Sequence, residues 1–402
     1  MIDVVGVTDA GFADLPQRLQ RLVSDASVVL GGRRQLASLP AVGGQVRRVW
    51  PSPLRDELPC LLDELPPGQV VALASGDPTL SGIGSTLIEL LGADAVRLHP
   101  AVSSAALARA RAGWSAESCE VVTVVGRSLH RVRRRLAQGV RLIVLCSDGT
   151  TPAALADLLV DAGCPDAAMT AWWHLGGADE GCRTATAARW GAERTPDLVL
   201  CTVAVPDDVA LDGPAPGRAE DCFEHDGQIT KRDLRASAVG HLRPTPGALL
   251  WDLGAGSGSV GIEWCLAGRD ARCVSVEQHT ERAGRLRRNG VRLGVDDLLE
   301  VVEARSADAL DELETPDAIF VGGGLTADLL ERAWRRLRGG GRFVAHAVTL
   351  DTEQILVAAA GRHGGELTRI SVEHARPLGR HLSWTPARTV VQWSADKPKE
   401  TP

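Results

Sequence analysis

Short apolar runs of strand length alternate with helical patterns from one end of the chain to the other. This alternation is typical of parallel sheets covered by helices, so the sequence predicts an α/β protein. In the first half, strands are predicted at residues 3–7, 70–74, 121–125, 141–146 and 197–203.

The composition changes in the middle of the chain. Residues 205–217 are rich in proline and glycine and show no periodicity, which is typical of a linker. Strands are then predicted again, at 248–253, 272–276, 299–302, 318–321, 341–347 and 389–393. A length of 402 residues also favours two domains. We expect an N-terminal domain at 1–207, a linker at 208–220, a C-terminal domain at 221–394 and a polar tail at 395–402.

Composition and charge narrow the class of function. Apolar residues make up 44% of the chain and charged residues 24%, and the net charge of −7 argues against a general nucleic-acid binder. The nine cysteines form no C-x-x-C pair, and no histidine stands at zinc spacing, so we expect neither a disulfide framework nor a metal site. The sequence contains no signal peptide pattern and no bilayer-length apolar stretch, which indicates a cytoplasmic enzyme.

A glycine-rich turn follows the predicted strand that contains Asp252, directly before a predicted helix. Its glycines are Gly254, Gly256 and Gly258. Glycine lets the backbone approach a ligand closely, and the helix start directs free N–H groups toward it. A dinucleotide fingerprint would need its third glycine at position 259, which is serine, so S-adenosylmethionine is favoured over a dinucleotide or a purely structural turn. Glu277, after the next strand, is expected to bind the ribose hydroxyls.

The first half has polar loops of its own after predicted strands. Gly76-Asp77-Pro78 leaves one strand, and residues 100–104 enter a helix with serine caps. Ligands of open α/β sheets bind at the carboxyl ends of strands, so these loops are candidates for a second site. The residues expected there are Gly76, Asp77, Pro78, Ser103 and Ser104.

These motifs resemble those of known methyltransferase families. The glycine turn flanked by Asp252 and Glu277 resembles a Rossmann-like methyltransferase. The segments 76–82, 99–104 and 126–127 resemble the tetrapyrrole methylases of cobalamin biosynthesis, in particular those that act on carbon 5. The C-terminal half resembles the decarboxylating precorrin methyltransferases that act on carbon 15, at residues 223–235, 319–324, 348–352 and 375–379. Together the resemblances cover nearly the whole chain.

The resemblances imply a bifunctional methyltransferase with one S-adenosylmethionine site in each domain. The implied reaction methylates precorrin-6 at carbons 5 and 15 and removes the carboxylate of the ring C acetate, giving precorrin-8. The family pattern also implies cofactor contacts by Thr230, Ser306 and Ala307. A polycarboxylate tetrapyrrole should be bound by basic residues, here His225, Lys231, Arg235, Arg376 and Arg380. We also expect a homo-oligomer.

The sequence leaves alternatives for the role of the N-terminal half, the substrate and the catalytic groups. The segments 6–11 and 79–81, together with Val125, depart from the tetrapyrrole methylase pattern. The N-terminal half is therefore either a second enzyme or a degenerate domain that binds tetrapyrrole or mediates oligomerisation, and a cobalt-containing substrate is a further alternative. Methyl transfer from a sulfonium requires alignment more than a strong base, and no pattern identifies the catalytic groups. His346 is interpreted as a core or rim histidine or as a substrate contact, and the basic run 131–135 as an amphipathic surface helix.

Overall fold

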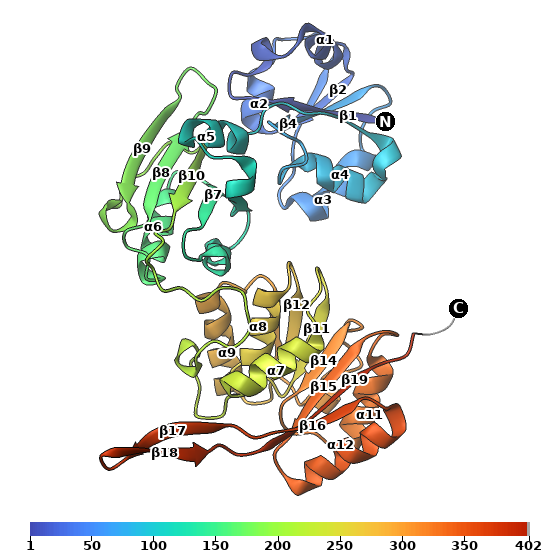
Figure 1. Cartoon of the computed structure of the whole chain (residues 1–402). Coiled ribbons are helices and arrows are strands. Elements are labelled where there is room, and N and C mark those ends of the chain that lie inside the picture. Colours follow the sequence, from blue (N-terminus) through green and yellow to red (C-terminus); the bar gives the residue numbers. More distant parts are fainter. Residues whose placement is uncertain (400–402) are drawn as a thin grey trace. The chain divides into compact units, whose positions relative to one another are not determined.

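The computed structural model describes residues 1–399 and divides the chain into two compact units (Figure 1). Unit 1 comprises residues 1–127 and 138–209, and unit 2 comprises residues 128–137 together with the chain from residue 210 onward. Within the described part of the chain, no helix combines the length and the apolar character needed to cross a membrane. The last three residues of the predicted tail, 400–402, lie outside the described residues.

The first sheet of unit 1 is parallel and has the strand order β3-β2-β4-β1-β5. Its strands are β1 (Ile2–Val7), β2 (Val28–Gly31), β3 (Val46–Val49), β4 (Val70–Ser75) and β5 (Val96–His99), and its helices are α1 (Gln17–Asp25), α2 (Arg33–Ala37), α3 (Leu54–Asp63) and α4 (Ile83–Leu91). Successive strand residues point to opposite faces, so Val5 and Leu73 join one buried cluster while Val4 and Ala72 join another. Because both faces are covered, the strands form continuous apolar runs in the sequence.

The second sheet of unit 1 is mixed, with the order β6-β7-β10-β8-β9. It contains β6 (Glu120–Thr123), β7 (Arg141–Leu145), β8 (Ala168–Trp173), β9 (Gly181–Thr186) and β10 (Val199–Ala204), with helices α5 (Ser104–Ala112) and α6 (Thr151–Asp161). Only β6 and β7 pair in parallel, so the expectation of parallel sheets needs correction here. The short connection from β8 to β9 explains the antiparallel pairing of these two strands, because a parallel pair requires a much longer crossover.

Unit 2 is built on one seven-stranded sheet of order β13-β12-β11-β14-β15-β19-β16. Its strands are β11 (Leu249–Leu253), β12 (Arg272–Val276), β13 (Leu299–Val302), β14 (Ala318–Val321), β15 (Arg342–Ala347), β16 (Glu366–Ile370) and β19 (Val390–Asp396). The first five strands in this order are parallel, and β19 is antiparallel to both of its neighbours. β19 ends two residues inside the predicted tail.

Helices cover both faces of this sheet (Figure 1). They are α7 (Arg232–Leu242), α8 (Ser259–Ala267), α9 (Thr280–Leu293), α10 (Ser306–Ala309), α11 (Ala327–Arg336) and α12 (Leu350–His363). On one face, Leu250 of β11 packs with residues of α7 and α8, and on the other face Trp251 packs with residues of α11 and α12. The carboxyl ends of the parallel strands therefore lie between two helical layers.

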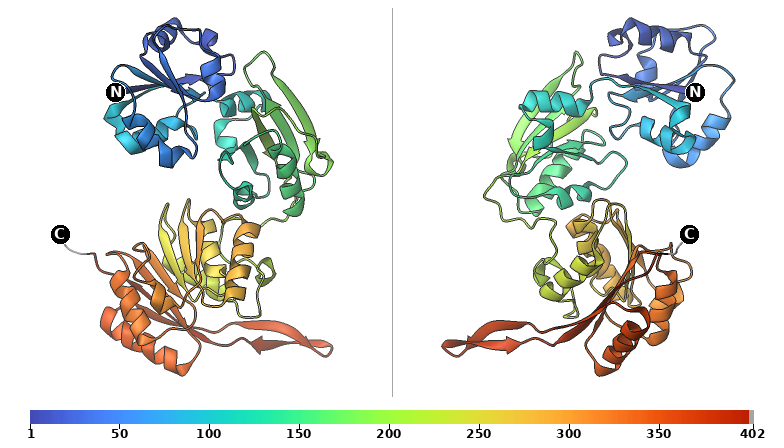
Figure 2. Two further views of the ribbon diagram at one scale, coloured as in Figure 1. Left: turned by 180° about the vertical axis from the view of Figure 1, so that it is seen from behind. Right: turned by 45° about the vertical axis from the view of Figure 1, so that its right-hand side comes forward.

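A two-stranded antiparallel hairpin, β17 (Glu373–Leu378) and β18 (His381–Pro386), extends away from the body of unit 2 (Figure 2). Every residue of both strands is exposed. Arg376 and Arg380, two of the basic residues predicted to bind substrate, lie on this hairpin and are not among the residues that line the cavity of unit 2. The predicted substrate contacts of Arg376 and Arg380 therefore have no support from their position.

The basic run of the N-terminal half lies in unit 2 and forms the short 3-10 helix η4 (Leu129–Arg135). The guanidinium of Arg134 donates to both carboxylate oxygens of Asp297 and, at 2.8 Å, to the carbonyl oxygen of Gly294, just beyond α9. The expected amphipathic surface helix is thus a packed 3-10 turn, anchored to unit 2 by Arg134.

Candidate active sites

The glycine turn of unit 2 has a backbone that requires glycine. Gly254, Gly256 and Gly258 all have positive φ, at 72°, 59° and 77°. A Cβ at Gly254 would lie 2.8 Å from the carbonyl oxygen of Gly323, and a Cβ at Gly258 would lie 2.5 Å from Cγ of Leu286. A side chain at Gly254 or Gly258 would therefore both strain the backbone and clash with a neighbouring segment, and one at Gly256 would strain the backbone.

Glu277 connects the turn to the end of β12. Its carboxylate accepts the N–H of Gly256 at 2.8 Å through one oxygen and the N–H of His279 at 2.9 Å through the other. A carboxylate has about four acceptor positions, so two remain after these bonds. The side chain is buried against protein but still lines the cavity, so those positions are available to a ligand hydroxyl.

Asp252 lies beneath the same turn at the end of β11. It is 1% exposed, and Oδ2 accepts the N–H of Gly261 at 3.1 Å. Burial raises the pKa of Asp252 to about 7, and the charge of Glu277 adds to this effect, while the hydrogen bond from Gly261 opposes it. The floor of the site thus contains a carboxyl that titrates near neutral pH.

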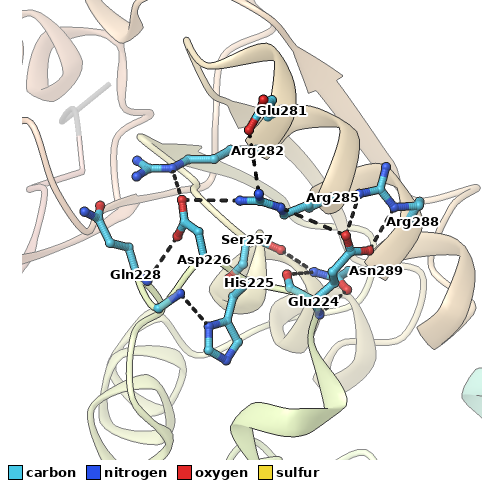
Figure 3. A network of polar contacts seen from close by, with 11 residues as sticks. Glu224, His225, Asp226, Gln228, Ser257, Glu281, Arg282, Arg285, Arg288 and Asn289 are labelled. Atoms are coloured by element: carbon cyan, nitrogen blue, oxygen red, sulfur yellow. Dashed lines mark hydrogen bonds and ion pairs between the residues drawn. The ribbon is translucent and has the colours of Figure 1, made fainter.

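Two acidic residues, Glu224 and Asp226, hold the segment that precedes α7 against α9 (Figure 3). Arg288 donates to both carboxylate oxygens of Glu224, and Arg282 donates to Asp226 at 2.8 Å. These hydrogen bonds hold the pKa of both carboxyls below their usual range. Asn289, which the sequence analysis did not identify, donates to the carbonyl oxygens of Glu224 and Ser257 at 3.0 Å each. It thereby connects this segment to the glycine turn.

A cavity of about 950 Å³ lies at these strand ends. Eight of the predicted residues line it: Thr230, Lys231, Asp252, Gly254, Gly256, Glu277, Ser306 and Ala307. Gly258 lies behind the turn, against Leu286. His225 is also outside the lining, and its Nδ1 accepts the N–H of Gly227 at 2.9 Å. Three arginines at the cavity, Arg282, Arg305 and Arg388, were not predicted.

Arg235 has a structural role and does not make the substrate contact that was predicted for it. Its guanidinium is fully buried, forms an ion pair with Glu263 at 2.8 Å and donates to the carbonyl oxygen of Thr230 at 2.6 Å. The ring of Phe223 lies 4.8 Å from the guanidinium carbon. All of these contacts are inside the core, so Arg235 is not available to a ligand.

His346, at the end of β15, lines the same cavity and is buried. Its Nε2 lies 3.0 Å from Oε1 of Gln392, and Oε1 also accepts the hydroxyl of Ser237 at 3.1 Å. An amide oxygen can only accept, so Nε2 of His346 carries the hydrogen. Burial lowers the pKa of His346 below its ordinary value, which keeps the imidazole neutral at pH 7. Gln392 was not identified from the sequence, although a glutamine inside an otherwise apolar strand is a signal for such a partner.

Unit 1 contains a second cavity of about 630 Å³, bounded by both of its sheets. Gly76, Ser103 and Ser104 line it, whereas Asp77 and Pro78 do not. The carboxylate of Asp77 folds back to accept the N–H and hydroxyl of Thr79, at 2.8 and 2.7 Å. A Cβ at Gly76, where φ is 58°, would lie 2.8 Å from Cα of Ser103. The two predicted loops therefore touch each other.

An acidic residue beside this second cavity was missed. Asp9 follows β1 and lines the cavity, and its carboxylate pairs with Arg34 at 2.5 Å and with Nδ1 of His174 at 2.9 Å. Asp9 lies in the segment that departs from the tetrapyrrole methylase pattern. The changed segment thus forms an ordered part of the cavity wall.

A parallel sheet that ends in a glycine turn, with a carboxylate after the neighbouring strand, defines unit 2 as a Rossmann-like methyltransferase domain. Residues 1–189 match the family of tetrapyrrole (corrin/porphyrin) methylases, and residues 221–397 match the precorrin methyltransferase domain. The chain is 42% identical over 399 residues to the precorrin-6Y C(5,15)-methyltransferase [decarboxylating] of Sinorhizobium sp., covering 98% of this chain and 96% of that protein. The chain belongs to the precorrin-6Y C(5,15)-methyltransferase (decarboxylating) family.

The chain is also similar to two further proteins. A protein of the same name from Mycobacterium tuberculosis is 38% identical over 403 residues, which cover 99% of this chain and all of that protein. The solved C-terminal domain of the precorrin-6Y C5,15-methyltransferase from Rhodobacter capsulatus is 42% identical, with a TM-score of 0.45, and covers 46% of this chain and all of that domain.

Proposed function

We propose that the chain is a bifunctional enzyme of cobalamin biosynthesis that methylates a precorrin at carbons 5 and 15 and removes the carboxylate of its ring C acetate. One observation carries the proposal. Each unit has its own cavity at glycine-containing strand ends, in a chain that matches relatives named for both methylations along almost their whole length.

In unit 2, the residues at the cavity fit S-adenosylmethionine, which would supply a methyl group bonded to a sulfonium. The glycine turn brings backbone close to the cavity, and Glu277 has acceptor positions left for two ribose hydroxyls. Ser306 and Ala307 line the wall that we assign to the adenine. The enzyme then aligns the reacting carbon with the methyl group, because the sulfonium leaving group needs no proton.

We assign the substrate carboxylates of this site to Lys231, Arg305 and Arg388, which line the cavity. Arginine suits these contacts because its fork of N–H donors matches a carboxylate. Leu234, Val372 and Val390 form an apolar part of the wall. An acetate carboxylate held against such a wall is poorly solvated, which favours the loss of carbon dioxide, and the electron pair of the broken bond enters the conjugated ring.

In unit 1, we assign a second S-adenosylmethionine to the loops of Gly76 and Ser103–Ser104. Gly6, Gly76 and Ser103 are in close backbone contact, and this contact supports a preformed binding surface at the ends of β1 and β4. The site would serve carbon 5. The alternative, a degenerate N-terminal domain, predicts that a single cofactor binds per chain.

We further propose that the chain is a homo-oligomer joined through the β17–β18 hairpin. Leu378, Leu382 and Trp384 are 67%, 72% and 69% exposed on it. A two-stranded hairpin is at best marginally stable in water alone, and large exposed apolar side chains favour burial against another surface. A second copy of the same hairpin offers a matching apolar surface.

The test is to incubate the full chain with the tetrapyrrole and S-adenosylmethionine and to count, by mass spectrometry, the methyl groups gained and the carbon dioxide lost. Gly258→Ala should abolish methylation at carbon 15 and spare carbon 5, since its Cβ would clash with Leu286. Gly76→Ala should have the opposite effect, because its Cβ would clash with Ser103. Loss of both methylations in either variant, with both units folded, would contradict two independent sites.

A further inference from the structure

We infer that His346 is the proton carrier of the C-terminal site: it takes the proton that leaves carbon 15 and delivers a proton to the side-chain carbon that loses carbon dioxide. This inference rests on the function proposed for that site. It assigns a catalytic residue to a reaction for which the sequence alone offered none.

The overall change at the substrate requires such a carrier. Carbon 15 bonds to the methyl group with a π-electron pair of the ring, while the pair of the S–CH3 bond stays on sulfur. The bond to the acetate carboxylate then breaks, its electron pair enters the positively charged ring, and carbon dioxide leaves. Carbon 15 still has to lose its hydrogen as a proton, and the remaining side-chain carbon has to gain one to become a methyl group. The two transfers balance, so one base that alternates between its neutral and charged forms serves both.

His346 is set up for this exchange by its partners. Its Nε2–H is held by Oε1 of Gln392, so the lone pair of the neutral ring is on Nδ1. Among the described residues, no group forms a hydrogen bond with Nδ1. When Nδ1 takes a proton, the imidazolium keeps its hydrogen bond to the Gln392 oxygen, which stabilises the charge. The edge contact with Phe320, at a centroid distance of 5.1 Å, fixes the plane of the ring.

The other candidate bases at the cavity are less suited. Asp252 lies beneath the glycine turn and accepts the N–H of Gly261. His279 is exposed and lies next to Glu277, on the side assigned to the ribose. His374 is on the exposed hairpin. His346 alone among these combines burial, a hydrogen bond that fixes its tautomer and a place in the cavity lining.

The test uses full-length His346→Gln, which keeps a donor for Gln392 and removes the base. We expect kcat for methylation at carbon 15 and for carbon dioxide release to fall by about 10²–10⁴-fold. Methylation at carbon 5 in the same chain and the affinity for S-adenosylmethionine, measured by calorimetry, should not change. The matched control is His363→Gln, since His363 is a partly buried histidine of the same unit that pairs with Glu331 away from the cavity. It should keep both activities.

Gln392→Leu provides a second variant and identifies Gln392 as a positioning residue. It should lower kcat at carbon 15 without changing KM, and ¹⁵N NMR of histidine-labelled protein should show that His346 loses its single Nε2–H tautomer. If His346→Gln does not fold, the inference is decided by kcat at carbon 15 and by the tautomer of His346 in Gln392→Leu. A wild-type rate in His346→Gln, or an equal loss of cofactor affinity and of both methylations, would overturn the inference. Failure of the proposed function would appear differently, as a wild-type chain that neither methylates carbon 15 nor releases carbon dioxide.

Discussion

The buried ion pair between Arg235 of α7 and Glu263 of α8 is the contact whose loss we expect to destabilise unit 2 most. Both side chains are completely buried, with Nε of Arg235 2.8 Å from Oε1 of Glu263. Glu263 also accepts the N–H groups of Gly217 and Arg218, at 2.9 Å each. Arg235 donates to the carbonyl oxygens of Thr230 and Arg218. The pair thus fastens the linker and the cavity residue Thr230 to the helical layer.

Removing one member of such a pair leaves the other charge buried without compensation, which costs about 3–5 kcal/mol. Arg235→Met also deprives two carbonyl oxygens of their donors, so we place it at the upper end of that range. For a unit of this size, each kcal/mol lowers Tm by about 2–4 °C, so the expected fall is roughly 10–20 °C. Combining Arg235→Met with Glu263→Gln should cost less than the sum of the two single changes, because neither charge is then left alone.

Calorimetric unfolding of the full-length variants measures these shifts. Arg272→Met is the control, because Arg272 and Glu314 of the same unit form a two-bond ion pair that is largely exposed. Breaking this pair should cost at most about 1 kcal/mol. The reasoning would be refuted if Arg235→Met unfolded at the wild-type temperature and instead raised KM for the tetrapyrrole. That result would make Arg235 a substrate ligand, as the sequence suggested.

Three further predictions concern the cofactor turn and the hairpin. Glu277→Ala should weaken binding of S-adenosylmethionine to unit 2 by at least about tenfold, since each charge-assisted bond contributes about 1.5–3 kcal/mol, whereas Glu281→Ala, a largely exposed neighbour, should leave the calorimetric affinity unchanged. Burial raises the pKa of Asp252 to about 7, so the folded chain holds a proton that the unfolded chain releases above about pH 4. The contribution of Asp252 to the free energy of unfolding therefore falls as the pH rises from about 4 to 7. The free energy measured by urea unfolding of Asp252→Asn should lack that fall. Leu382→Asp should reduce the mass measured by light scattering, and an unchanged mass would exclude the hairpin as the interface.

The cofactor site of unit 2 could be predicted from the sequence because it depends on local signals. A glycine turn and a carboxylate that follow successive strands are brought to one edge by the parallel sheet itself, as β11 and β12 show. The basic residues could not be placed in the same way. Arg235 lies on α7, where the sequence does not distinguish a surface position from one that faces Glu263 of α8. Arg376 precedes β19 in sequence but belongs to a separate hairpin.

Residues that act through partners distant in the sequence could not be predicted either. Gln392 and His346 are opposite each other across the antiparallel β15–β19 pair, a register that no local pattern fixes. Asn289 reaches Ser257 from α9, 32 positions along the chain. The second sheet of unit 1 was expected to be parallel because strand-length apolar runs do not show the direction of pairing.

The arrangement of charge in unit 2 separates structural groups from those that face the ligand. The acidic residues before α7 and the arginines of α9, such as Asp226 with Arg282 and Glu224 with Arg288, neutralise each other. The cavity is lined by glycine backbone of the turn and also by Lys231, Arg305 and Arg388. The positive charge of these side chains would attract a polycarboxylate, and pairing with its carboxylates leaves the neutral His346 free to exchange a proton with the ring. A substrate with fewer carboxylates should therefore bind more weakly without changing the protonation state of His346.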